Sequence, residues 1–68
     1  APVKAPMPGL VLRMVADNGA SVAKDEVIMV IEAMKMEMEI KAPCDGTVTM
    51  SVAQGDKFNT GDTLATVG

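Results

Sequence analysis

The side chain with the clearest potential for chemistry is the amine of Lys35, which stands between two methionines in the segment Glu32-Ala33-Met34-Lys35-Met36. A primary amine on a flexible four-carbon stem can be joined covalently to another group, and the stem then serves as a tether. Most surface lysines are only solvated. The other four lysines fall at predicted strand or loop positions of that ordinary kind: Lys4, Lys24, Lys41 and Lys57. Lys35 is therefore our candidate modification site.

The methionines around Lys35 suggest a second chemistry. Met34, Met36 and Met38, together with Met29, could form a soft thioether site for Cu(I). The alternation of the segment places Met36 and Met38 on the core face instead, where methionine is a common gap filler. The core interpretation is the better one, so we predict no metal site.

The remaining reactive residue types do not assemble an active site. Cys44 follows Pro43 in a turn and has no neighbouring base in sequence, and the chain contains no His, Trp or Tyr. Five aspartates fall at turns, where Asp serves local hydrogen bonding: Asp17, Asp25, Asp45, Asp56 and Asp62. We predict no catalytic residues and expect that the chain is not an enzyme by itself.

A β-hairpin is predicted to position Lys35. Residues 36–41 alternate between apolar and charged, which is typical of a strand with one dry face, and residues 27–31 are continuously apolar. A two-residue turn at Met34-Lys35 sorts both strands consistently. The apolar pairs are Ala33 with Met36, Ile31 with Met38, Met29 with Ile40 and Val27 with Ala42. The other face pairs Glu32 with Glu37, Val30 with Glu39 and Ile28 with Lys41.

Two alternatives to this turn are weaker. A three-residue turn would mix core and solvent faces, a slip that is disfavoured wherever one face is buried. Helix propensity alone would make 32–41 a helix, but Met36, Met38 and Ile40 would then fan around it instead of forming a stripe. The two-residue turn needs positive φ at Met34 and Lys35. Such strain in residues other than glycine is uncommon and often marks a functional position.

The chain consists of two similar halves. Ala5-Pro6-x-x-Gly9-x-Val11 recurs as Ala42-Pro43-x-x-Gly46-x-Val48 at an offset of 37, and one deletion aligns the segment from Gly19 with that from Gly55. Each half predicts four short strands, at 3–5, 10–15, 21–23 and 27–32 and at 36–42, 47–52, 57–59 and 64–67. The predicted fold is all-β, with the halves packed about an approximate two-fold axis as a small sandwich or flattened barrel. The Lys35 turn is the joint, far from both termini.

Length and composition limit the class of protein. Sixty-eight residues with a net charge of −3 make one small domain, and the acidic balance argues against nucleic acid as a partner. The longest apolar run, 27–31, is too short to cross a membrane. A lone Cys44 fits a reducing compartment, and the N-terminus does not read as a signal peptide. We expect a cytoplasmic location. The predicted core includes Val11, Val22, Val27, Ile31, Met38, Val48, Phe58 and Leu64.

The segment Glu32-Ala33-Met34-Lys35-Met36 resembles the attachment motif of biotinyl domains, the biotin carboxyl carrier modules of biotin-dependent carboxylases, decarboxylases and transcarboxylases. The resemblance covers the whole chain and includes Ala5-Pro6-Met7-Pro8-Gly9 and Gly55-Asp56-x-Phe58. The short link from Val15 to Ser21 lacks the thumb insertion of many bacterial acetyl-CoA carboxylase carriers. That departure favours relatives of pyruvate carboxylase, transcarboxylase and sodium-pumping decarboxylases.

The resemblance implies a barrel-sandwich hybrid of two four-stranded antiparallel sheets and a carrier function. Lys35 would bear covalent biotin, with Ala33, Met34 and Met36 as its motif, and would carry activated CO₂ between active sites of partner domains. Those partners would be a biotin protein ligase and carboxylase, carboxyltransferase or decarboxylase domains. Residues 1–68 would be the C-terminal part of a longer subunit, and any membrane association would come through that parent. A lipoyl carrier is the nearest alternative, although that family typically has Asp-Lys-Ala at this turn. A second alternative is an unmodified structural or interaction module of the same fold, against which the motif argues.

Overall fold

A computed structural model describes residues 1–68, which form eight strands and no helix. The strands are β1 (Pro2–Lys4), β2 (Gly9–Met14), β3 (Ser21–Val22), β4 (Val27–Ala33), β5 (Met36–Lys41), β6 (Gly46–Met50), β7 (Lys57–Phe58) and β8 (Thr63–Val67). All eight predicted strands are present, and the ends differ from the predicted ones by two residues or fewer. The all-β prediction is therefore confirmed.

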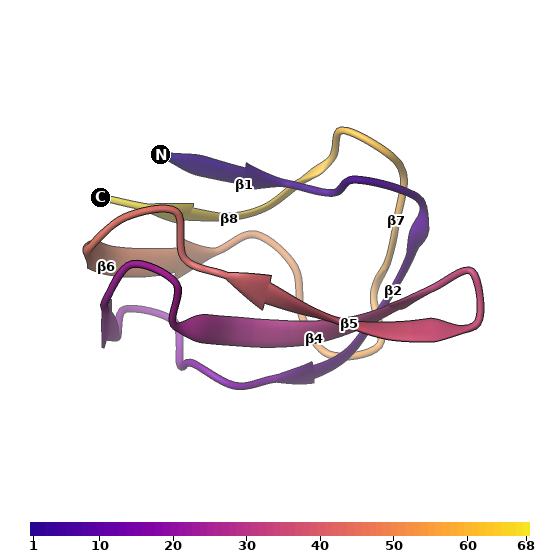
Figure 1. Cartoon of the computed structure of the whole chain (residues 1–68), viewed down its shortest axis with the longest axis horizontal. Coiled ribbons are helices and arrows are strands. Elements are labelled where there is room, and N and C mark those ends of the chain that lie inside the picture. Colours follow the sequence, from indigo (N-terminus) through magenta and orange to yellow (C-terminus); the bar gives the residue numbers. More distant parts are fainter.

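The strands form two four-stranded antiparallel sheets that pack face to face (Figure 1). One sheet has the order β1-β8-β6-β3 and the other has the order β5-β4-β2-β7. Replacing each strand by its counterpart in the other half of the sequence converts the first order into the second. The two halves therefore interlock, because each sheet takes two strands from each half. This arrangement confirms the predicted two-fold repeat.

Backbone hydrogen bonds repeat between the halves as well. Gly19 donates to the carbonyl of Val48 at 2.7 Å, and its counterpart Gly55 donates to that of Val11 at 2.8 Å. Asp25 donates to Ala42 at 2.8 Å, where the second half has Gly61 donating to Ala5 at 2.9 Å. Each of these bonds joins one half to the other. The connecting loops thus fasten the two repeats together.

The core is built from matching positions of the two halves. Its aligned pairs are Val11 with Val48, Ala5 with Ala42, Val22 with Phe58, Ile28 with Leu64, Met29 with Ala65 and Ile31 with Val67, and all of them are buried. Six of the eight predicted core residues are buried, but Val27 and Met38 are only half-buried. Both lie at margins of the β4–β5 pair, so the opposite sheet covers them incompletely.

The predicted pairing of β4 with β5 is right near the turn and wrong at the far end. Val27 faces Lys41 instead of Ala42, because a β-bulge at Ile28 shifts the register between Val27 and Met29. Ile28 and Met29 are both fully buried as a result. A bulge adds one unpaired residue and reorients the side chains beyond it. The strict alternation assumed from the sequence therefore ends at Met29.

The Lys35 turn and the chain termini lie at opposite ends of the molecule, as predicted (Figure 1). Ala1 and Val67 exchange backbone hydrogen bonds, the one from the Val67 amide measuring 2.9 Å. The pairing of β1 with β8 is the counterpart of the pairing of β5 with β4. The chain termini therefore lie at the end of the β1–β8 pair that corresponds to the Lys35 turn in the β5–β4 pair.

No helix long and apolar enough to cross a membrane is present.

Candidate functional site

Lys35 occupies the turn between β4 and β5. The φ angles are 52° at Met34 and 63° at Lys35, so both central residues of the two-residue turn are left-handed, as predicted. Positive φ at both positions is the requirement of a type I′ turn, whose twist suits a hairpin. The helix alternative over 32–41 is wrong, because strands occupy both sides of the turn.

The backbone pairing beside the turn is continuous and holds it in register. Ala33 pairs with Met36, Glu32 with Glu37, Ile31 with Met38 and Val30 with Glu39, all as predicted. Ile31 and Ala33 are buried, so the β4 side of the hairpin is anchored in the core up to the residue before the turn. A strained turn persists when its flanks are fixed in this way. The hairpin thus presents Lys35 from a rigid base.

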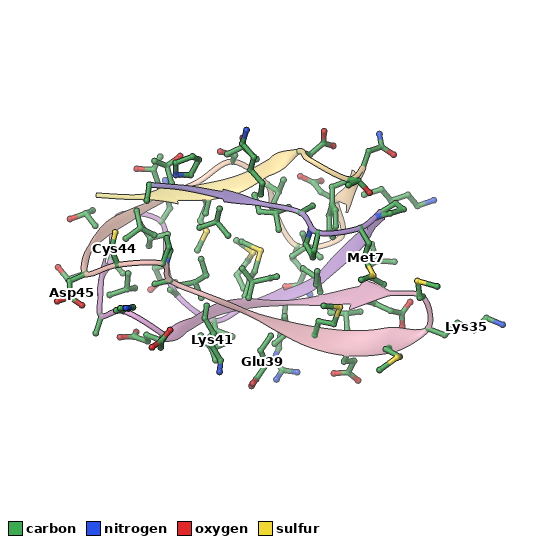
Figure 2. The ribbon with its side chains drawn as sticks, turned by 45° about the horizontal axis from the view of Figure 1, so that its top comes forward. Met7, Lys35, Glu39, Lys41, Cys44 and Asp45 are labelled. Carbon is green, nitrogen blue, oxygen red and sulfur yellow. The ribbon has the colours of Figure 1, made fainter.

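Lys35 extends beyond the end of the domain, whereas Cys44 and Asp45 mark the opposite end (Figure 2). The molecule measures 29 Å along its longest axis and 19 Å and 17 Å across it. Exposure alone does not distinguish Lys35, because all five lysines are exposed. Lys24 also lies in a tight turn, but its amide donates to the Asp45 carboxylate at 2.6 Å. Lys35 is the lysine whose turn projects.

The two methionines beside Lys35 are in water. Met34 is 78% exposed and Met36 is 66% exposed. The placement of Met36 in the core was therefore wrong. The register pairs it with buried Ala33 on the inner strand β4, but Met36 itself lies at the tip end of the edge strand β5, where its side chain is left in water. Met38, one row further in, is half-buried and packs against the core.

The four methionines of the copper hypothesis do not share one environment. Met29 belongs to the buried core, whereas Met34 stands at the solvent-exposed turn. The hairpin thus spreads these thioethers from the interior to the tip. The chain also has no group of three or more His, Cys, Asp or Glu side chains placed to hold a metal ion.

Charges beside the turn form one row across the sheet. Glu37 lies opposite Glu32, Glu32 opposite Leu10, and Leu10 opposite Lys57. Directly opposed residues share one face of a sheet, so these four side chains lie on the same outer face. The acidic pair was predicted from the hairpin register. Leu10 and Lys57 were not, because strand order does not follow from alternation within one hairpin.

The base of the hairpin leaves room for only small residues. A Cβ placed on Gly9 would stand 2.2 Å from the carbonyl oxygen of Glu32 and 3.2 Å from the Cβ of Ala33. Ala33 is itself 3% exposed. The motif alanine therefore packs against a bare backbone, and this close approach of β2 fixes the position of β4 one residue before the turn.

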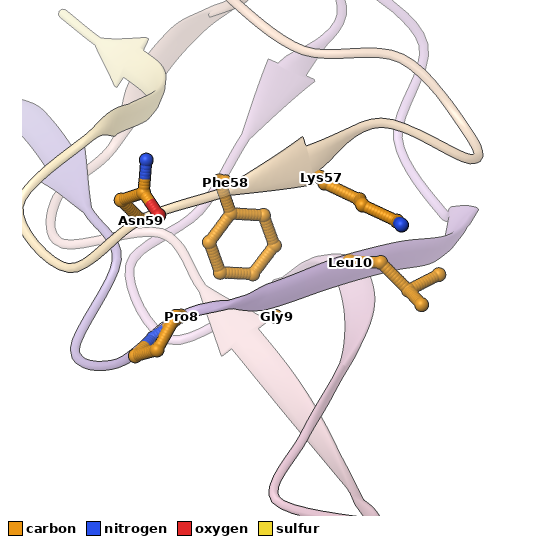
Figure 3. A pocket seen from close by; sticks show the side chains of 6 residues that line it. All are labelled: Pro8, Gly9, Leu10, Lys57, Phe58 and Asn59. Carbon is orange, nitrogen blue, oxygen red and sulfur yellow. The ribbon is translucent and has the colours of Figure 1, made fainter.

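A shallow depression lies at the edge of the same sheet (Figure 3). Its lining consists of Pro8, Gly9, Leu10, Lys57, Phe58 and Asn59. Lys57 is the only ionisable residue of this set, so the depression contains no acid–base pair. Cys44 is an unpaired, half-buried thiol, and its Sγ donates a hydrogen bond to the carbonyl of Val67 at 3.6 Å.

Comparison with known proteins identifies the fold and its relatives. The family model described as "Biotin-requiring enzyme" matches residues 1–67. Biotin carboxyl carrier protein of Streptococcus mutans is 44% identical over 64 residues, which cover 93% of this chain and 49% of that protein. Pyruvate carboxylase of Bacillus subtilis is 41% identical over 63 residues, or 91% of this chain and 6% of the enzyme. The chain thus spans about half of the first relative and a small part of the second.

Two solved structures share this architecture. The urea carboxylase of Kluyveromyces lactis matches 100% of the chain with a TM-score of 0.91 and 29% identity, over 6% of its own length. The lipoyl domain of the 2-oxoglutarate dehydrogenase complex of Azotobacter vinelandii matches 97% of the chain with a TM-score of 0.78 and 25% identity, over 95% of its own length. Both agree with the barrel-sandwich fold. With the family model matching nearly its whole length, this chain belongs to the biotin/lipoyl attachment-domain family.

Proposed function

We propose that this chain is a biotin carboxyl carrier domain in which Lys35 bears the cofactor. The observation that carries the proposal is the turn itself, where a strained two-residue hairpin holds one lysine at the projecting end of a rigid domain. Relatives named biotin carboxyl carrier protein and pyruvate carboxylase support biotin over the lipoyl alternative. Because a lipoyl domain has a similar fold, the experiment below must distinguish a biotinyl group from a lipoyl group on Lys35.

The residues at the turn fit such a group. The Lys35 amine is exposed and takes part in none of the side-chain hydrogen bonds of the domain. An amine of this kind can attack the activated carboxyl group of biotin, which forms the amide and expels the activating group. When bound, biotin supplies a ureido nitrogen that accepts and releases a carboxyl group. The chain's own contribution is to hold the attachment point away from its surface.

The chain's contribution to the reaction is proximity. Buried Ile31 and Ala33 fix the hairpin, and the four-carbon stem of Lys35 supplies the flexibility beyond it. A tether of this type raises the concentration of the cofactor at each partner site to the order of millimolar. The domain itself does no chemistry, in keeping with its similarity to carrier proteins and to the carrier portions of carboxylases.

The parent protein and the partners are part of this proposal. Because the chain matches about half of one relative and only 6% of another, we place residues 1–68 as one module of a longer subunit, with the C-terminal position expected from the resemblance. A biotin protein ligase would attach the cofactor, and carboxylase, carboxyltransferase or decarboxylase domains would use it. The short link of residues 15–20 between β2 and β3 leaves no room for a thumb, which favours a pyruvate carboxylase, transcarboxylase or decarboxylase parent. The unpaired Cys44 suits a reducing, cytoplasmic compartment.

Mass spectrometry of the natively expressed protein tests the cofactor directly. A tryptic peptide containing Lys35 should carry one biotinyl group, whereas a lipoyl group would establish the alternative and an unmodified peptide would contradict both.

The variant that exchanges the turn residues, Met34→Lys with Lys35→Met, keeps the composition but moves the amine by one position. Because adjacent turn residues direct their side chains differently, this variant should accept biotin very slowly or not at all.

A further inference from the structure

The fold sorts its seven methionines by their access to solvent. Met34 and Met36 are 78% and 66% exposed, and they are two of only three large hydrophobic side chains that the domain leaves in water. Met29 is fully buried. Of the remaining four, all are half-buried: Met7, Met14, Met38 and Met50. The two most accessible thioethers are thus the two that flank Lys35.

We propose that Met34 and Met36 are a site of reversible oxidation by small hydroperoxides, and that their oxidation slows cofactor attachment at Lys35. The second part rests on the proposed function. In each reaction, a lone pair of the thioether sulfur attacks the outer oxygen of the hydroperoxide. An S–O bond forms and the O–O bond breaks, the sulfur loses two electrons, and the peroxide is reduced to an alcohol or to water.

Solvent access makes the reaction selective for the turn. The sulfur must meet the oxidant directly, so exposed thioethers react first. Met29 lies in the core and can be reached only when the domain opens. The expected order of oxidation is therefore Met34 and Met36, then the half-buried methionines, and Met29 last.

Oxidation at the turn changes the surface around Lys35 without loosening the domain. A sulfoxide is polar and chiral, whereas a thioether is flexible and apolar. Neither Met34 nor Met36 belongs to the buried core cluster. A protein that must close around Lys35 would therefore meet two polar groups in place of two apolar ones. Sulfoxide reductases reverse the change, with one enzyme for each epimer: a dithiol supplies two electrons and becomes a disulfide, and the sulfoxide oxygen leaves as water. The site can therefore act as a switch.

The first experiment measures the order of oxidation in the protein without biotin. The Cys44→Ser substitution removes the only thiol. The protein is treated with increasing amounts of hydrogen peroxide, and each sample is analysed by peptide mass spectrometry and by a melting curve. Met34 and Met36 should become sulfoxides while Met29 remains intact and the melting point stays within about 2 °C. If Met29 or Met50 oxidises as fast as Met34, the proposed selectivity is wrong.

The second experiment measures biotin attachment by a biotin protein ligase before and after this treatment. The rate should fall about tenfold when both sulfoxides are present, and a mixture of the two sulfoxide reductases with a dithiol as reductant should restore it. The control is Met34→Leu with Met36→Leu, compared with its own untreated form, because leucine at both positions leaves nothing to oxidise at the turn. An unchanged rate in the doubly oxidised protein, or an equal loss in the leucine variant, overturns the switch. If the untreated protein accepts no biotin, the proposed function is wrong, and the proposed effect of oxidation on attachment is wrong with it. The first experiment needs no ligase, so it still tests the order of oxidation.

Discussion

Relief of the strain at the Lys35 turn should make the domain more stable. Met34 and Lys35 have φ angles of 52° and 63°, and a left-handed conformation costs an L-residue about 1–2 kcal/mol. The variant Met34→Asn with Lys35→Gly installs the pair that this turn type prefers. Glycine also lowers the stability by about 0.5–1 kcal/mol, because it raises the conformational entropy of the unfolded chain. The free energy of unfolding should therefore rise by about 1–2 kcal/mol, or roughly 5–10 °C in melting point.

The turn at Lys24-Asp25, between β3 and β4, provides a matched control. Asp25 has a φ of 70°, and the second repeat already has glycine at the aligned position, Gly61, with a φ of 85°. Asp tolerates this conformation better than Met or Lys, so Asp25→Gly should gain no more than about 0.5 kcal/mol. Urea and thermal unfolding of the three proteins measure these differences. If the Asn-Gly variant is no more stable than the parent, the turn is not strained and this explanation of its residues fails.

Two further substitutions test the packing that supports the turn. Phe58→Ala removes a side chain that is 4% exposed and should cost about 3–5 kcal/mol in urea unfolding, whereas half-buried Val27→Ala should cost less than about 2 kcal/mol; equal costs would show that the burial has been misjudged. Gly9→Ala places a Cβ 2.2 Å from the Glu32 carbonyl and should destabilise the domain by more than about 1 kcal/mol. Amide exchange should then speed up first in β2 and β4, and an unaffected hairpin would contradict the role given to Gly9.

The hairpin could be predicted from the sequence because its information is local. The alternation of apolar and charged residues over 36–41, set against the apolar run 27–31, admits one register around the turn, and from Met29 to Ile40 the structure has that register. The turn length and both positive φ angles follow from it. The repeat likewise predicts the strands, since the same apolar pattern must bury itself twice.

Features that depend on the opposite sheet could not be predicted in this way. The bulge at Ile28 shifts the register of β4 against β5, and the continuous apolar run of residues 27–31 contains no local signal that marks its position. The exposure of Met36 beside buried Ala33 depends on the place of β5 at the edge of its sheet, which alternation within the hairpin does not give. The interlocked strand order and the row from Glu37 to Lys57 also need contacts between distant segments. The positive φ at Asp25 was missed, although its alignment with Gly61 is a signal that could have revealed it.

The mass of the intact protein after coexpression with a biotin protein ligase tests the central claim most directly. We predict one biotinyl group on the parent protein and on Lys24→Arg, the control from the other lysine-bearing turn. Lys35→Arg should carry none, because a guanidinium remains protonated and cannot supply the attacking amine. Its stability should change by no more than about 0.5 kcal/mol, since Lys35 is exposed. A biotinyl group on folded Lys35→Arg would show that another lysine is the attachment site and would contradict the account.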